Sequence, residues 1–223
     1  MRKRGLIPAW ISFDFGNSAF AVIMVTLVLP IYFGNVIVTD GRGDLYWGIA
    51  MSISMLIVAL TGPVLGAIAD STDSKKHFLL AFSLVTILCT AALAFVEPGM
   101  VVLAMGLFIL ANAGFEGGII FYNAFLPEIT DEAHYGRLSG YGFAAGYIGS
   151  FAIILMVSDL LTSNRISESF LITAAFFLLF ALPLFLIAPK RVGARTRTES
   201  PIKAGFSRTI ETIRSIRKYK NVA

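Results

Sequence analysis

Long apolar runs, separated by short polar clusters, dominate the sequence. They predict six membrane spans, at about 12–38, 45–69, 77–96, 99–126, 138–161 and 167–188. Each run can cross a hydrocarbon layer of about 30 Å as a helix that rises about 1.5 Å per residue. The runs are too long and too uniformly apolar for the strands of a membrane barrel. The pattern therefore predicts an all-α integral membrane domain over residues 1–188.

The charged residues are few, and most of the basic ones fall on one side of the predicted bundle. Only 14% of the residues are charged, against about 25% in a typical soluble domain. All but two of the 18 Lys and Arg residues, Arg42 and Arg165, lie on the side that holds both termini. Because basic residues concentrate on the cytoplasmic side of membrane proteins, we expect both termini in the cytoplasm. The formal net charge of +4 is therefore a topology signal and does not indicate nucleic-acid binding.

The segment after the last span has a different character. Residues 189–223 begin as a polar, basic stretch, which predicts a cytoplasmic linker. Apolar residues then recur every three or four positions at about 205–219, with basic residues between them, which predicts an amphipathic helix. Two placements of this helix stay open and are compatible: on an anionic inner leaflet, or against the cytoplasmic ends of the bundle.

Ionisable residues inside the spans are the main candidates for function, because a charge in hydrocarbon is costly. Glu116 lies in the middle of the fourth span, and the spacing places Asn112 and Asn123 on the same helix face. Glu116 is either a proton or substrate site or a partner in an interhelical hydrogen bond. Asp14, close to Asn17 at the predicted start of the first span, is either a second such site or a carboxylate that interacts with the helix N-terminus.

The fifth span is rich in small residues. Gly142 and Gly146 have the spacing that lets two helices approach closely, and Gly149 extends the pattern. We expect these glycines to serve helix packing. Tyr147, which lies among them, is expected to line a cavity or to anchor the helix against one.

Other chemistries find no support in the sequence. There is no nucleotide-binding loop and no hydrolase nucleophile motif. His77 and His134 fall in predicted loops without metal-ligand spacing. The single cysteine, Cys89, is expected to be a small buried apolar residue. We expect no metal, no cofactor and no enzymatic activity.

Three motifs resemble one family of transporters. The first runs from Phe13 to Phe20 (FDFGNSAF) and the second from Phe121 to Glu128 (FYNAFLPE). The third begins with GRLSG at Gly136 and continues with GYIG up to Gly149. Over residues 10–190 the chain resembles the vacuolar amino-acid effluxers of autophagy and their bacterial relatives, within the major facilitator superfamily.

The resemblance implies a fold of twelve helices in two halves, each a 3+3 inverted repeat, with this chain as the N-terminal half. It also implies a secondary transporter that works by alternating access in the inner (plasma) membrane of a bacterium or archaeon. Eukaryotic members of the family are associated with amino-acid export, and the resemblance does not settle the substrate of the bacterial-type members. From the polar residues gathered on the first and fourth spans we expect a small polar metabolite, such as an amino acid, and transport linked to protons. The expected path residues are Asp14, Asn17, Asn112, Glu116, Tyr122, Asn123 and Tyr147.

The loop between the second and third spans partly matches the superfamily's signature. The matching residues are Gly66, Asp70, Lys75 and Lys76. The departures from the signature are Ser71, Asp73 and Ser74. In the family this loop gates the cytoplasmic side by contacting the other half, so we expect the matching residues to form a gating loop.

One half cannot supply both walls of an alternating-access site. The expected partner is a missing C-terminal half if the chain is a fragment, and a copy of itself or a second chain if it is a natural half-size protein. Two other functions stay open. One is a non-transporting membrane scaffold or regulatory subunit that uses the glycines and the basic tail for contacts, and the other is a lipid-handling protein.

Overall fold

The computed structural model describes residues 3–71 and 75–188, and within these ranges every regular element is a helix. The first span consists of four consecutive pieces: α1 (Lys3–Phe20), the π-helix η1 (Ala21–Leu27), α2 (Val28–Tyr32) and the π-helix η2 (Phe33–Ile37). The other elements are α3 (Gly43–Ser71), α4 (Lys75–Leu93), α5 (Val101–Asn123), α6 (Leu126–Ile129), the 3₁₀-helix η3 (Glu132–His134), α7 (Tyr135–Thr162) and α8 (Ile166–Ile187). The predicted linker and amphipathic helix of residues 189–223 lie outside the described residues.

Six helical segments of the described chain are long and apolar enough to span a membrane, which confirms the predicted all-α membrane fold. Their boundaries agree with the predicted ones to within a few residues, except at the start of the first span. Its helix begins at Lys3, because Leu6, Ala9 and Trp10 are buried in the bundle and continue the apolar pattern. The expectation that Asp14 opens this helix is therefore wrong, since about three turns of α1 precede it.

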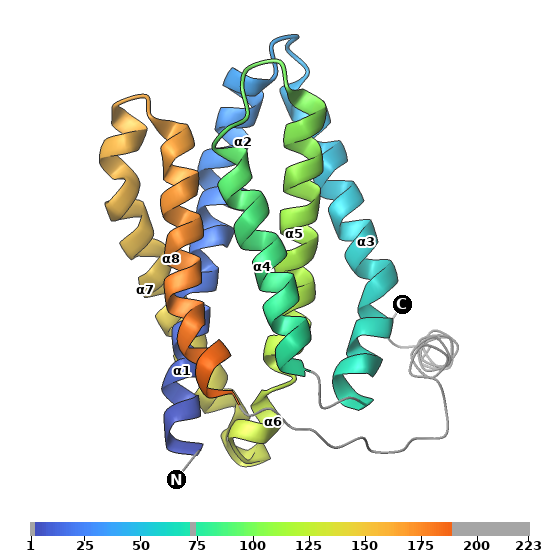
Figure 1. The fold of residues 1–223 in the computed structure, drawn as a ribbon, viewed down its shortest axis with the longest axis vertical. Coiled ribbons are helices and arrows are strands. Elements are labelled where there is room, and N and C mark those ends of the chain that lie inside the picture. The colour runs from blue at the N-terminus through green and yellow to red at the C-terminus, as the bar shows by residue number, and fades with distance from the viewer. Residues whose placement is uncertain (1–2, 72–74, 189–223) are drawn as a thin grey trace, which may run out of the picture.

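The helix contacts around α1 are equivalent to those around α5. α1 packs mainly on α8 and α7, and α5 packs mainly on α4 and α3. α4 and α8 also pack on each other, whereas α3 and α7 stand at opposite edges of the bundle (Figure 1). If the first span is exchanged with the fourth, the second with the fifth and the third with the sixth, the same pairs of helices are in contact. The two helices of each exchanged pair run in opposite directions. This is the pattern of a 3+3 inverted repeat.

The middle of the first span departs from α-helical geometry. The π-helical turns of η1 precede Pro30, which has no backbone N–H to donate. The Thr26 hydroxyl donates a hydrogen bond to the Ala21 carbonyl (3.0 Å), five residues earlier, and so adds a side-chain bond within this wider turn. Because π-helical turns are frequent at functional sites, the middle of this span is a further region of interest.

Basic residues lie at both ends of the bundle, in different numbers. One end holds the start of α1 together with α6, and we call it the α6 end; the loops after η2, α4 and α7 lie at the other end (Figure 1). Lys75, Lys76 and Arg137 belong to helices that start at the α6 end. Arg42 and Arg165 lie in loops at the opposite end.

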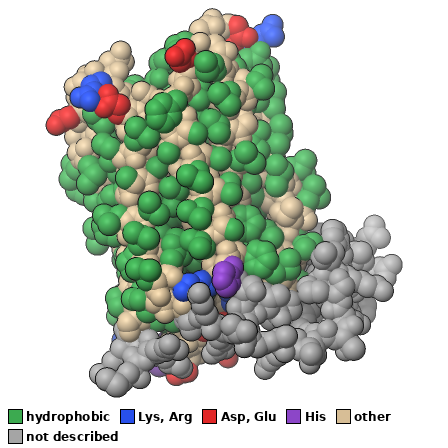
Figure 2. All heavy atoms as spheres, viewed as in Figure 1, with side chains coloured by type: hydrophobic (Ala, Val, Ile, Leu, Met, Phe, Trp, Pro, Cys, Tyr) green, Lys and Arg blue, Asp and Glu red, His purple; other side chains and the backbone are tan. Residues whose placement is uncertain are grey.

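On the face shown in Figure 2, apolar side chains cover the body of the bundle, and the charged side chains lie toward its two ends. Large apolar residues such as Leu88, Leu179 and Leu186 are mostly exposed. A continuous apolar surface of this extent is unfavourable in water. In a bilayer the same surface meets hydrocarbon, and the helices satisfy their own backbone hydrogen bonds.

Candidate functional site

α5 carries a polar face that changes from buried to exposed along its length. Asn112 is completely buried, and its Nδ2 donates a hydrogen bond to Ser54 Oγ of α3 (2.9 Å). Glu116, one turn further on, is half-buried, and Asn123 is exposed at the end of the helix. Since α5 is continuous from Val101 to Asn123, these three polar residues occupy one helix face.

Glu116 has no cationic partner within the described ranges. The two ion pairs found there, Lys75–Glu128 and Arg165–Glu168, lie near the ends of the bundle. Placing a charged side chain at the centre of a membrane helix costs on the order of 2.5–3.5 kcal/mol. At its depth in α5, the Glu116 carboxyl group therefore requires either contact with water or a bound proton.

Glycines on another face of α5 let α4 approach it closely. A Cβ atom on Gly114 would lie 2.7 Å from Thr86 Oγ1, and one on Gly117 would lie 2.7 Å from the Phe82 ring. Thr86 Oγ1 donates a hydrogen bond to the Ala111 carbonyl of α5 (3.1 Å). α4 thus fills the space beside these glycines, and this packing sets the rotation of α5 and the direction of its polar face.

Asp14 lies at the contact between α1 and α7. Its side chain is half-buried, and its Oδ2 would be 2.9 Å from a Cβ atom on Gly142, so the carboxylate rests against bare backbone of α7. Neither ion pair of the described residues involves Asp14. Asp14 and Glu116 are thus two carboxylates without a basic partner in the described chain, one on each of the spans that the inverted repeat makes equivalent.

The glycines of α7 that we expected to serve packing lie against α1. A Cβ atom on Gly146 would lie 2.5 Å from Ser18 Oγ, and one on Gly149 would lie 2.1 Å from the Phe15 carbonyl oxygen. Ser150 Oγ donates a hydrogen bond to the Ser18 carbonyl (3.3 Å) in the same contact. Real Cβ atoms essentially never come within 3.0 Å of such neighbours, so the two helices reach this separation only because these positions are glycine.

Tyr122 joins α5 to α1 at a point that sequence reasoning did not identify as a contact. Its hydroxyl donates a hydrogen bond to the Trp10 carbonyl (3.3 Å), and Trp10 Nε1 donates to the Tyr122 carbonyl (3.2 Å). The two rings are stacked with centroids 4.3 Å apart. This reciprocal pair buries both side chains and gives Tyr122 a structural contact between the equivalent spans. An aromatic residue with a polar atom inside a span is the one sequence signal that could have indicated it.

The seven expected path residues differ in their exposure. The exposed ones are Asn123 and Tyr147, the half-buried ones Asp14 and Glu116, and the buried ones Asn17, Asn112 and Tyr122. α1 and α5 meet through the rings of Phe20 and Phe115 (4.9 Å) and through the Trp10–Tyr122 pair. Of the path residues, Tyr122 is the one that takes part in these ring contacts. Tyr147 stands apart on α7, with 77% of its side chain exposed.

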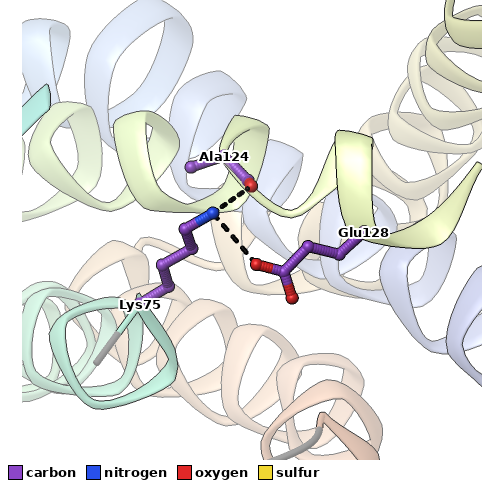
Figure 3. Close-up of polar contacts among 3 residues, drawn as sticks. All are labelled: Lys75, Ala124 and Glu128. Atoms are coloured by element: carbon purple, nitrogen blue, oxygen red, sulfur yellow. Dashed lines mark hydrogen bonds and ion pairs between the residues drawn. The ribbon is translucent and has the colours of Figure 1, made fainter. Parts of the chain in front are cut away.

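The two lysines at the start of α4 bind the C-terminal ends of two other helices. Lys75 Nζ donates to the carbonyl of Ala124, which caps α5 (3.1 Å), and forms an ion pair with Glu128 of α6 (2.9 Å) (Figure 3). Lys76 Nζ donates to the carbonyl of Ala188, which caps α8 (2.8 Å). A cation at a helix C-terminus is stabilising because the last carbonyls there lack helical partners. The lysine pair therefore holds the α6 end together within this six-helix unit.

For the other two expected gating residues, Gly66 and Asp70, the structure gives less information. Among the described residues, no atom outside the backbone of its own helix lies within 4 Å of a Cβ atom built on Gly66. Asp70 belongs to the end of α3, and its side chain is outside the described part of the structure. Contact of this loop with another half stays a prediction.

Replacing Lys75 with methionine is expected to lower the free energy of unfolding by about 1–3 kcal/mol, because it leaves Glu128 and the Ala124 carbonyl without their shared donor in a largely buried place. Thermal unfolding in detergent measures this change. Arg165→Met is the matched control, since it removes the exposed ion pair at the opposite end and should leave the unfolding temperature unchanged. Equal destabilisation by both variants would contradict the role given to Lys75.

Comparison with known proteins gives matches over most of the chain. The family described as vacuole effluxer Atg22 like matches residues 46–223. An uncharacterized MFS-type transporter of Bacillus subtilis, YxiO, is 31% identical over 227 residues, which cover 95% of this chain and 53% of YxiO. An uncharacterized protein of Aquifex aeolicus is 26% identical over 182 residues, covering 82% of this chain and 45% of that protein. The chain thus spans about half the length of these curated relatives.

A further, shorter match is to a fungal protein whose name corresponds to the description of the family. Autophagy-related protein 22 of Coccidioides immitis is 40% identical over 79 residues, covering 35% of this chain and 13% of that protein. The shared segment is short, so it adds to the family assignment and says little about the remaining spans.

Proposed function

Because the chain belongs to the family of vacuole effluxer Atg22-like proteins, we propose that it forms one six-helix half of a secondary transporter. Together with a second half, or with a copy of itself, it would move a small polar metabolite by alternating access. The observation that carries this proposal is the Glu116 carboxyl group, half-buried inside a span and without a cationic partner in the described chain. Such a group suits a protein that binds a proton or a cationic substrate within the membrane.

The chemistry of the polar residues supports an amino acid as the substrate class. Asp14 and Glu116 on the two equivalent spans are suited to a proton and to the ammonium group of an amino acid. Asn123, exposed on the same face as Glu116, offers an amide that can donate to a substrate carboxylate. Since the two carboxylates belong to α1 and α5, we propose that these helices form the wall of the transport path.

The chain is an integral membrane protein, and we propose that its α6 end faces the cytoplasm. Lys75, Lys76 and Arg137 at this end outnumber Arg42 and Arg165 at the other, in keeping with the excess of basic residues on cytoplasmic surfaces. The bacterial sources of two of the relatives support a location in a bacterial inner membrane.

The proposal is tested by transport into vesicles that contain the purified protein in its native assembly. A panel of labelled amino acids, with lysophospholipids as a second class, is offered with and without an imposed pH gradient. We expect at least one amino acid to accumulate when the gradient is present and to stop accumulating when a protonophore collapses it. Movement of lysophospholipids alone would favour lipid handling, and the absence of transport of either class would favour a scaffold or regulatory subunit.

A further inference from the structure

Asn112 leaves one hydrogen-bond acceptor without a partner at the contact between α3 and α5. The side chain is completely buried, and its Oδ1 is one of two buried side-chain polar atoms in the described chain that make no hydrogen bond, the other being Ser83 Oγ. Buried side-chain oxygens nearly always accept a hydrogen bond, so each exception calls for an explanation. An amide oxygen in this position requires a donor.

The hydrogen bonds around Asn112 determine which way its amide faces. Asn112 Nδ2 donates to Ser54 Oγ (2.9 Å) and lies 3.9 Å from Met51 Sδ. Each of its two hydrogens therefore points toward one of these atoms. The Ser54 hydroxyl in turn donates to the Met51 carbonyl (2.8 Å). If the amide were turned over, its oxygen would face Ser54 Oγ, which could donate to it only by giving up the Met51 carbonyl. The amide oxygen therefore points away from α3.

The nearest ionisable side chain along the helix is Glu116, four residues further on. Residues at this spacing are neighbours on the helix surface, and long helical side chains lean toward the N-terminus. The Glu116 side chain thus leans toward Asn112. A carboxylate can only accept hydrogen bonds, whereas a protonated carboxyl group can donate one.

We propose that Asn112 Oδ1 is the acceptor for the proton that Glu116 carries. Glu116 takes a proton from water and forms a carboxyl O–H bond, and this O–H donates to Asn112 Oδ1. When the proton returns to water, the carboxylate has no hydrogen to donate and turns toward the aqueous side. Asn112 is then a positioning residue, and the inference rests on the proposed function in that Glu116 is its proton-binding group.

This arrangement connects protonation to helix packing. Asn112 bonds to Ser54 of α3 through one end of its amide and to protonated Glu116 through the other. Hydrogen bonds in such a chain polarise one another, so the bond to α3 is stronger when Glu116 is protonated. The contact between α5 and α3, an edge helix of the bundle, thereby responds to the proton.

Few other titratable groups lie on the neighbouring segments. α3 has none between Tyr46 near its start and Asp70 at its end. The remaining titratable residues on the spans that pack around α5, beyond those at the helix ends, are Asp14 and Tyr32 on the first span, Cys89 on α4 and Tyr122 on α5. None of these is basic, so the described surroundings of Glu116 offer no cation that would replace the proton.

Infrared difference spectroscopy of the protein in lipid vesicles tests the proposal directly. The spectrum is recorded as the pH is lowered, and the carbonyl stretch of a protonated carboxyl group that disappears in Glu116→Gln is assigned to Glu116. In the nearly isosteric Asn112→Leu variant, this band is expected to move to higher frequency, because the carboxyl O–H has lost its acceptor. Asn112→Ser, which keeps a smaller acceptor, should give a lesser shift and serves if the leucine variant does not fold.

Thr86→Val is the matched control, since it removes a hydrogen bond between α4 and α5 and leaves Asn112 and its partner Ser54 in place. The Glu116 band should keep its frequency to within a small fraction of the Asn112→Leu shift. An unchanged band in both Asn112 variants, an equal shift in Thr86→Val, or the absence of any band that Glu116→Gln removes would each overturn the proposal. Transport measured in the same vesicles separates the two claims, because a protein that transports without the expected shift refutes only the role of Asn112.

Discussion

Replacing Gly149 with alanine is expected to force α7 away from α1 and to lower the stability of the bundle by about 1–3 kcal/mol or more. The new Cβ atom would lie 2.1 Å from the Phe15 carbonyl oxygen. Because that neighbour is backbone and belongs to a helix, it cannot rotate away as a flexible side chain could. The measurement is the thermal unfolding temperature of the purified variant in detergent, together with its yield from the membrane.

Gly140→Ala provides the control on the same helix. In the described part of the chain, nothing outside the backbone of α7 itself lies within 4 Å of a Cβ atom at Gly140. Alanine is favoured over glycine inside a helix by roughly 0.5–1 kcal/mol. We therefore expect unchanged or slightly higher stability for this variant. A Gly149→Ala protein as stable as Gly140→Ala would show that the close approach of α1 and α7 is not required.

Glu116→Gln is expected to reduce pH-gradient-driven transport to the rate measured without a gradient. Glutamine keeps the size of the side chain and its ability to donate to a neighbour, but it cannot release a proton at any working pH. The variant should therefore resemble the permanently protonated protein. Substrate exchange between the two sides of a vesicle, which moves no net proton, should continue.

The control for this prediction is Glu97→Gln, which neutralises an exposed carboxylate in the loop between α4 and α5. Its gradient-driven transport should equal that of the unchanged protein. Full gradient-driven transport by Glu116→Gln would rule out proton coupling through Glu116. Loss of both exchange and driven transport would instead assign Glu116 to substrate binding.

The spans could be predicted from sequence because each one is a local pattern. Their length and apolar character come from single runs of residues, and a helix is the form in which such a run satisfies its backbone in lipid. The start of the first span was missed because Pro8 and the basic residues before it are typical of a helix boundary. Burial of Leu6 and Trp10 in the bundle extends the helix past that boundary, and burial is a tertiary effect.

Only those features of the candidate site that lie along one helix could be predicted from the sequence. The shared face of Asn112, Glu116 and Asn123 follows from helical periodicity and needs no knowledge of the neighbouring helices. The partners that give these residues their environment, such as Ser54 of α3, lie dozens of residues away in sequence and depend on how the helices pack. For the same reason the sequence indicated that Lys75 and Lys76 belong to a gating loop on the cytoplasmic side, but it did not indicate the helix ends that they bind.

The central claim is that the face of α5 that carries Glu116 lines an aqueous path inside the membrane. Its most direct test is the reaction of a cysteine at position 116 with a membrane-impermeant thiol reagent, in a background where Cys89 is replaced by serine. Leu84→Cys is the control, because Leu84 is exposed on the apolar surface of α4 at a comparable depth. Thiols react as thiolates, which form in water and not in hydrocarbon. We expect Glu116→Cys to react and Leu84→Cys to stay unmodified; equal inertness of both cysteines would contradict the transport path.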